Sequence, residues 1–311
     1  MFTFRYLNDA PILDVDTYPE LNGNINGPSL IAAPDWLPDP PGNYLLYFAH
    51  HEGHTIRLAA SDSLTGPWRM QPPALSLEQS GFALRTPLPH ELCEEAREFI
   101  ARDADGDYPH IASPDALVDP EARQIRLYYH GRLEDGRQRT RVAVSADGTD
   151  FKVQPETVGL SYMRVFQHSD WYYALSMPAQ LYRSKDGLQG FETGPQMTTA
   201  PIRHHALLKH REDWYVFWTR VGDTPERILV SRLNTQGDWS EWYFEEPVDV
   251  HRAEKSWEGG DLPANASKYG AVHERANQLR DPAIFVENGR IYLIYAIAGE
   301  QGLAIGELVP R

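Results

Sequence analysis

Short apolar segments recur along the whole chain and are separated by clusters of Gly, Pro, Asn and Asp. Short hydrophobic runs bounded by turn residues predict β-strands rather than helices. Five of these runs are rich in Tyr, Phe or Trp and cover 44–49, 125–130, 171–175, 214–218 and 291–295. Each follows a less aromatic apolar segment, at 27–31, 113–118, 162–166, 203–208 and 281–286. The pattern therefore predicts five repeated pairs of strands.

A third and a fourth strand complete the repeated unit. The third strand ends at a Ser, a Gly-containing turn follows, and an aromatic residue opens the fourth strand. These pairs are Ser61 and Trp68, Ser145 and Phe151, Ser184 and Phe191, and Ser231 and Trp239. Radial repetition of four-stranded sheets is a β-propeller. The sequence thus predicts an all-β, five-bladed β-propeller in one domain, 1–311, against the alternative of a β-sandwich whose strands resemble one another by chance.

The fifth unit supplies the expected means of closing the ring. It ends after three strands, whereas residues 2–7 alternate like a strand, so the N-terminal strand should pair in blade five and remove the open edges. The predicted blades cover 26–75, 108–155, 160–196, 202–245 and 280–311. Two insertions, 69–107 with an expected helix at 90–101, and 245–279, interrupt the repeat and are candidate walls or lids.

Composition narrows the classes of partner. The chain has 44 acidic and 29 basic residues, a net charge of −15, which argues against nucleic acid and against an anionic membrane surface. No apolar run is long enough to span a membrane. The single cysteine and the absence of a secretory signal in the first residues predict a cytoplasmic location, and the oligomeric state is left open.

Ionisable residues gather at one predicted face. In a propeller the first strands line the central channel, and their starts open on the same face as the loops between second and third strands. That face should carry His50, His51, His54, His110, Asp115, His130, Arg164, Arg203, His204, Glu226, Arg227, Arg280, Asp281 and Glu300. Such crowding favours a site for a polar substrate, with ordinary solvated loops as the alternative.

Aromatic strands, Ser-x-Asp-Gly turns and Pro-Asp or Asp-Pro steps together make the chain resemble the five-bladed glycoside hydrolases. These are the family 43 arabinanases and xylosidases and their relatives in families 32, 62, 68, 117 and 130. The resemblance implies an Asp base in blade one, an orienting Asp in blade two and a Glu acid in blade three. Asp115 matches the second of these, but Gly27 stands at the first position and 162–165 contains no Glu. Relatives in family 117 are thought to use a His acid, which His204 could supply.

Glycoside hydrolysis needs one group to protonate the leaving oxygen and another to activate water or attack carbon. Asp281 and Asp115 are the first candidate pair, with Glu226 and His204 as further candidates. The candidate substrate-binding residues are Asn26, His50, His51, His110, Arg164, Arg227, Glu258, Asp261 and Arg280. The arginines suit a carboxylated or sulfated sugar, unless they pair with neighbouring carboxylates.

Three functions remain open. The first is an exo-acting glycosidase for short oligosaccharides, acidic ones included; the second is a lyase that uses His and Arg; the third is an inactive carbohydrate-binding propeller. No cofactor is required, although the resemblance allows a structural metal ion in the channel and His50, His54 and His110 could form a metal site. The run 103–107 resembles a calcium loop, but Pro114 stands where the final ligand belongs, so a solvated turn is expected.

Overall fold

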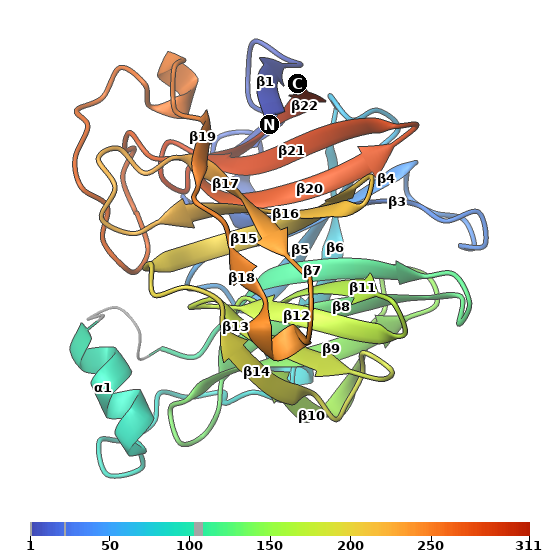
Figure 1. The fold of residues 1–311 in the computed structure, drawn as a ribbon, viewed down its shortest axis with the longest axis vertical. Coiled ribbons are helices and arrows are strands. Elements are labelled where there is room, and N and C mark those ends of the chain that lie inside the picture. Colours follow the sequence, from blue (N-terminus) through green and yellow to red (C-terminus); the bar gives the residue numbers. More distant parts are fainter. Residues whose placement is uncertain (1, 22, 103–107) are drawn as a thin grey trace.

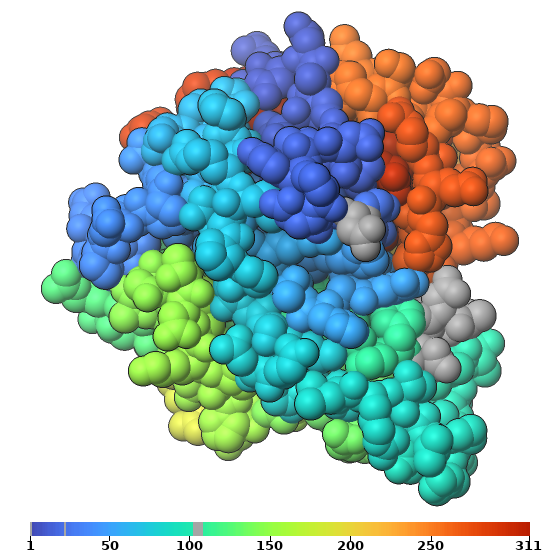
Figure 2. All heavy atoms as spheres, turned by 180° about the vertical axis from the view of Figure 1, so that it is seen from behind, coloured from blue at the N-terminus to red at the C-terminus, as the bar shows by residue number. Residues whose placement is uncertain are grey.

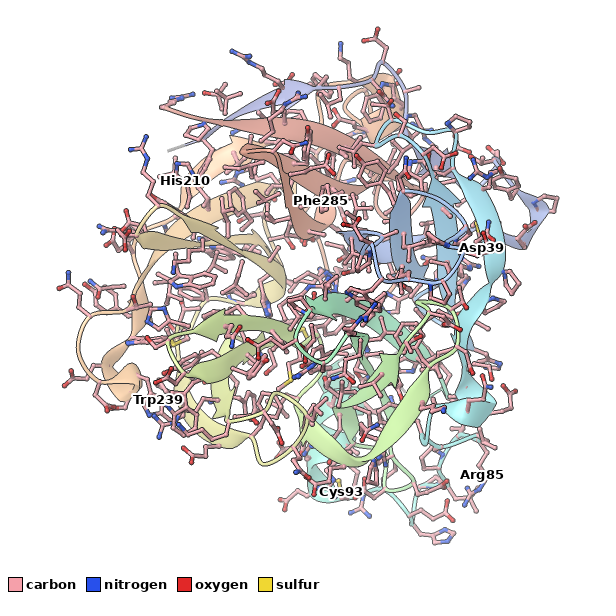
Figure 3. The ribbon with its side chains drawn as sticks, turned by 90° about the vertical axis from the view of Figure 1, so that its right-hand side faces the viewer. Asp39, Arg85, Cys93, His210, Trp239 and Phe285 are labelled. Atoms are coloured by element: carbon pink, nitrogen blue, oxygen red, sulfur yellow. The ribbon has the colours of Figure 1, made fainter. Side chains whose placement is uncertain are left out.

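The strands form five antiparallel sheets around a common centre (Figure 3). The computed structural model describes residues 2–21, 23–102 and 108–311. Blade one contains β3 (Asn26–Ala32), β4 (Tyr44–Ala49), β5 (Thr55–Ser61) and β6 (Arg69–Ser76). Blade two contains β7 (Ile111–Asp119), β8 (Gln124–Arg132), β9 (Gln138–Ser145) and β10 (Lys152–Gly159). The prediction of a five-bladed propeller is confirmed.

The other three blades follow the same order, inner strand first. Blade three contains β11 (Arg164–His168), β12 (Trp171–Ser176), β13 (Gln180–Ser184) and β14 (Glu192–Gln196). Blade four contains β15 (Ile202–His210), β16 (Asp213–Arg220), β17 (Ile228–Asn234), β18 (Tyr243–Phe244) and β19 (Val248–His251). Blade five contains β20 (Arg280–Glu287), β21 (Arg290–Ile297), β22 (Gly302–Pro310), β1 (Phe2–Tyr6) and β2 (Leu13–Asp14).

The N-terminal strand closes the ring, as predicted. β1 pairs antiparallel with β22 from Phe2 opposite Pro310 to Tyr6 opposite Gly306. Figure 1 shows both chain ends side by side at this edge of blade five. Closure in this way makes one blade from both ends of the chain.

Within a blade, the inner strands are more buried than the fourth strand. β3 is buried along nearly its whole length, whereas β14 is mostly exposed. Proline, which cannot donate to a strand ladder, lies in the outer strands β6, β10 and β14. These prolines blunt edges that could otherwise pair with another chain.

Aromatic second strands connect neighbouring blades. The Tyr47 hydroxyl of blade one donates to the Gly148 carbonyl of blade two, and the Tyr128 hydroxyl of blade two donates to the Gly187 carbonyl of blade three, both over 2.7 Å. Each acceptor glycine lies in a Ser-x-Asp-Gly turn and has a positive φ. The two repeated sequence features therefore meet in one inter-blade contact.

The two insertions differ in part from expectation. The helix α1 spans Glu94–Arg102 instead of 90–101, and the segment before it, which contains Pro87 and Pro89, forms a turn. Within 245–279, which holds few strand signals, β19 pairs with β17 beside β18. The predicted acidic turn at 103–107 lies outside the described residues. Among those described, the helices are too short and too polar to cross a bilayer.

Candidate active site

Four of the five innermost strands are irregular near their starts. The ladder shifts register between Asn26 and Ser29, Ala112 and Asp115, Ile202 and His205, and Arg280 and Ala283. In three blades the irregular step is a residue with positive φ followed by proline: Gly27, Ser113 and Asp281 have φ of 58°, 50° and 50°. Bulges of this kind redirect side chains and are frequent beside functional sites.

A side chain at Gly27 would be crowded and strained, in keeping with the missing carboxylate of blade one. A Cβ at this position would lie 3.0 Å from the Ser113 Cα, a backbone atom of blade two. The backbone N–H of Gly27 instead donates to Asp281 Oδ2 over 2.9 Å. Blade five thus places a carboxylate next to the position where the family resemblance implied an Asp.

Asp281 is fully buried. Its other oxygen contacts His204 Nδ1, and the His204 ring packs 4.3 Å from the ring of Tyr162. Burial, and then the neighbouring Arg203, hold the pKa of His204 well below its usual range, so the ring is neutral. The structure therefore brings the two catalytic candidates His204 and Asp281 together, but below the surface of the site.

A buried chain of alternating charges runs beside this pair. Arg203 Nε donates to Glu226 over 3.0 Å, Arg280 Nε lies 3.7 Å from Glu226, and Arg280 Nη1 donates to Glu300 over 2.9 Å. Glu300 then lies 3.2 Å from His51 Nδ1. The side chains of Glu226, Arg280 and Glu300 have no exposed surface. Glu226 is therefore held mainly by Arg203, and Arg280 by Glu300, without solvent.

Glu300 is the carboxylate that orients His51. Burial alone would raise the pKa of Glu300, but His51, Arg280 and Asn24 lower it well below its usual range. The Asn24 amide donates to Glu300 over 2.6 Å and its oxygen accepts the backbone N–H of His51 over 2.9 Å. A charged carboxylate on Nδ1 fixes the orientation of the imidazole and leaves Nε2 for chemistry.

Two adjoining cavities lie on this face. The inner pocket is lined by His51, Tyr108, His110, Tyr162, Arg203 and Gly270 and has a volume of about 30 Å³. The outer pocket, of about 240 Å³, lies between α1 and the segments 136–138, 160–161 and 177–178. The two share Phe99, Gln138, Met177 and Tyr269. Figure 2 shows the two insertions, teal and orange, projecting from the same edge of the molecule.

Aromatic residues of the insertions cover the inner pocket. Phe99 comes from the first insertion and Tyr269 from the second, and Tyr108 directly follows the first. A volume of about 30 Å³ accommodates only one or two water molecules. A sugar ring can enter only if these side chains move, which agrees with the expectation that the insertions act as walls or lids.

The buried His130 ring lies between His110 and Tyr162, two residues that line the inner pocket. Ring centroids are 5.4 Å apart between His110 and His130 and 4.3 Å apart between His130 and Tyr162. Burial lowers the pKa of His110 to about 3 and that of His130 well below its usual range. These neutral histidines are suited to hydrogen bonding with an uncharged group and not to binding an anion.

Arg164 and Asp115 lie in the central channel. The Arg164 guanidinium donates to the carbonyls of Pro114, His205 at 3.2 Å and Pro28 at 3.4 Å, which belong to three blades. Asp115 Oδ2 accepts the Val165 N–H over 2.8 Å, and burial raises its pKa against the opposing effects of Arg164 and that hydrogen bond. Both residues therefore connect blades, and neither lines the two pockets.

The central channel holds a fixed positive charge where the resemblance allowed a metal ion. The carbonyl oxygens of Pro28, Pro114 and His205 accept from the Arg164 guanidinium, and this charge disfavours a cation beside it. Within the described ranges, no group of three or more His, Cys, Asp or Glu side chains is placed to bind a metal, so His50, His54 and His110 do not form such a site.

The remaining predicted residues are more dispersed. Arg227 pairs with Asp223 and Asp249, as the alternative for the arginines anticipated, and Asp261 is exposed. Glu258 is buried against blade five, where it accepts from Tyr6 and Tyr295. Asn26 is buried at the start of β3, and His50 accepts the backbone N–H of Glu52.

Sequence reasoning did not assign Tyr162, Gln138, Phe99 and Tyr269 to the site. Tyr162 has a positive φ of 59°, which is uncommon for an aromatic residue and turns it toward the pocket. Nothing in a strand pattern marks such a residue. Phe99 and Tyr269 lie in the two insertions, which the interrupted repeat identified only as segments.

Comparisons with known proteins agree with this architecture. A family-43 β-xylosidase/α-arabinofuranosidase from a compost microbial metagenome superposes with a TM-score of 0.61 at 14% identity, covering 100% of this chain and 96% of the other. The GH43_1 enzyme of Xanthomonas citri gives a TM-score of 0.58 at 12% identity, covering 97% and 89%. The chain thus has the five-bladed propeller fold of the family 43 glycoside hydrolases.

Sequence comparison relates the chain to a viral protein. It is 31% identical over 314 residues to the uncharacterized protein R118 of Acanthamoeba polyphaga mimivirus, covering 93% of this chain and 84% of the other. The chain belongs to the same family as that viral protein. No protein-family model matches it.

Proposed function

We propose that this protein cleaves glycosidic bonds of short oligosaccharides at the inner pocket. The observation that carries the proposal is His51, which lines that pocket and is held through Nδ1 by the buried carboxylate of Glu300. Histidine backed by a carboxylate is a proton-transfer arrangement. The propeller fold, shared with glycosidases of family 43, supports the choice of substrate class.

Hydrolysis requires two proton-transfer groups, and two histidine–carboxylate pairs lie near Tyr162. In the proposed mechanism His51, oriented by Glu300, protonates the leaving oxygen. His204, in contact with Asp281 and packed against the Tyr162 ring, belongs to the second pair, which assists activation of water. In this mechanism the two pairs replace the two carboxyl groups that serve as acid and base in other glycosidases.

The enclosed site supports an exo-acting mode. The inner pocket is bounded by α1 and by the second insertion, so a long polysaccharide has no open groove to cross at this point. A chain end that enters beneath Phe99, Tyr108 and Tyr269 would place one sugar next to His51. Short oligosaccharides are therefore the proposed substrates.

A second candidate is elimination from an acidic sugar. Of the described residues that line the inner pocket, none is a carboxylate, whereas Tyr162, His51 and Arg203 all line it. A lyase uses a base such as Tyr or His to remove a carbon-bound proton, and a cation to stabilise the adjacent negative charge. This lining is the observation that favours the lyase.

The test is a screen of aryl glycosides and of neutral and uronate-containing oligosaccharides with the purified full chain. Hydrolysis gives products whose anomeric configuration NMR can follow with time. Elimination gives an unsaturated sugar with strong ultraviolet absorption and consumes no water. Absence of turnover on every member of the screen would contradict the proposed function and leave the inactive propeller.

A further inference from the structure

The outer pocket has a different chemical character from the inner pocket. Its wall includes Ala96 and Phe99 of α1, Leu160, Met177 and Pro178. Tyr269, which is 43% exposed, forms part of the wall of both pockets. A cavity lined in this way gains free energy by removing apolar surface from water and has little to offer a sugar hydroxyl.

The charged residues at the rim of the outer pocket already have partners. Glu95 accepts two hydrogen bonds from Arg139, at 2.6 and 2.7 Å, and Arg137 donates to Asp135 over 2.9 Å. Neither side chain needs a charged ligand to balance it. The occupant that suits this pocket is therefore uncharged.

The size of the pocket limits the occupant to something close to a single ring. Its volume is about 240 Å³, and an apolar protein cavity of about 150 Å³ binds benzene. Aromatic contacts are available from Phe99 and Tyr269, and the Met177 sulfur adds a favourable contact with a ring edge. A flexible aliphatic chain would use none of this aromatic geometry.

The two pockets adjoin at Phe99, Gln138, Met177 and Tyr269, so one molecule can occupy both once these side chains move. We propose that the outer pocket binds an uncharged aromatic substituent attached to the sugar that enters the inner pocket. The substrate class is then an aromatic glycoside or an aromatic ester of a sugar. This inference rests on the proposed function for the sugar, but the aromatic subsite itself can be tested without any turnover.

The test uses benzyl alcohol as an uncharged aromatic probe, with binding measured by ligand-observed NMR. The wild-type protein should bind it. Leu160→Trp, which fills the outer pocket, should weaken binding roughly tenfold or more, since the lost ring burial exceeds 1.4 kcal/mol. Leu84→Trp is the matched control, because Leu84 is 60% exposed and lines neither pocket. It should leave binding unchanged.

A second variant guards against misfolding of the first. Phe99→Gln removes a ring from the half-buried face of α1 and should also weaken binding of benzyl alcohol. No binding by the wild type, equal binding by wild type and both pocket variants, or tighter binding of hexanol than of benzyl alcohol would each overturn the inference. The last result would assign the pocket to an aliphatic chain.

The outcomes separate this inference from the proposed function. Binding of benzyl alcohol without turnover of any glycoside would keep the aromatic subsite and remove the enzymatic proposal. Equal kcat/KM for phenyl and methyl glycosides of one sugar, together with no probe binding, would keep the enzymatic proposal and remove the aromatic subsite. If both proposals hold, phenyl glycosides should exceed methyl glycosides roughly tenfold in kcat/KM, and Leu160→Trp should abolish that preference.

Discussion

At the scale of single residues, the site depends on carboxylates placed behind other groups. Asp281 is hidden by His204, and Glu300 by His51. The sequence predicted Asp281 and His204 as candidates because an Asp-Pro step and a His pair stand at strand starts. Their contact could not be predicted, since it depends on how the inner strands of the neighbouring blades four and five pack against each other.

His51 is the residue on which the proposed chemistry depends most directly. His51→Gln should lower kcat about 10²-fold, the scale of a lost proton-transfer group. Its side chain is 13% exposed and contacts the buried Glu300, and the Gln amide keeps a hydrogen-bond donor for that carboxylate. Steady-state kinetics on the best substrate of the screen measures the effect. His54→Gln, in the same loop but exposed, is the control, and equal rates for both variants would remove His51 from the mechanism.

Gly27 allows a direct test of why blade one lacks its carboxylate. Gly27→Asp should lower the free energy of unfolding by about 1–3 kcal/mol without raising activity, because the new Cβ meets Ser113 and φ is positive. Gly23→Asp separates these two causes: Gly23 has a φ of 73° but nothing within 4 Å of a Cβ. Denaturant titration should show a clearly smaller loss for Gly23→Asp. Equal losses would mean that backbone strain alone, without the contact to Ser113, causes the loss of stability.

At the scale of elements, the second strands were easier to predict than the outer strands and the insertions. Alternation and aromatic content predicted the second strands almost to the residue, as in β4 and β21. β19 was not predicted, because Val248–His251 is short and pairs with β17 only after an interruption at β18. α1 begins at Glu94 and not at residue 90, because the segment before it contains two prolines and forms a turn.

The loop that follows β19 is attached to blade five by Glu258, which gives a pH prediction. Burial alone would raise the pKa of Glu258, but bonds from His251, Glu254 N–H and Lys255 N–H lower it from 4.5 to about 2. A carboxyl with a depressed folded pKa stabilises the protein above its unfolded pKa. That stabilisation, about 3 kcal/mol, is lost as the pH falls from 4.5 toward 2.

Glu258→Gln should therefore be less stable than the wild type at pH 6, and the difference should shrink as the pH approaches 2. Urea titrations across this range measure it. Glu246→Gln, an exposed carboxylate on the same segment, should follow the wild-type curve. A difference between wild type and Glu258→Gln that stays constant with pH would contradict the assigned ionisation.

At the scale of the whole molecule, the ring was predictable and the centre of the ring was not. Five repeats and a missing fourth strand determine the propeller and its closure. The position of Arg164 on the axis does not follow from any repeat, because its partners are backbone carbonyls of blades one, two and four. A sequence shows that an arginine is present but not which carbonyls its side chain can reach.

Arg164→Met should destabilise the whole ring, since three buried carbonyls lose a donor, each worth about 1–3 kcal/mol. Thermal denaturation should show a lower Tm for this variant and an unchanged Tm for Arg97→Met on the exposed face of α1. Because Arg164 supplies the central cation, a chelator should leave the wild-type Tm unchanged. A chelator-dependent Tm would show that a metal ion shares the channel.

Closure by β1 also decides how the molecule would respond to mechanical force. Phe2 lies opposite Pro310, so both ends leave the same end of one antiparallel ladder. Tension applied to the two termini would break the hydrogen bonds of this ladder one after another, as in opening a zipper, instead of loading them together in shear. The blade that closes the ring would therefore open first and at low force, with the other four blades still folded.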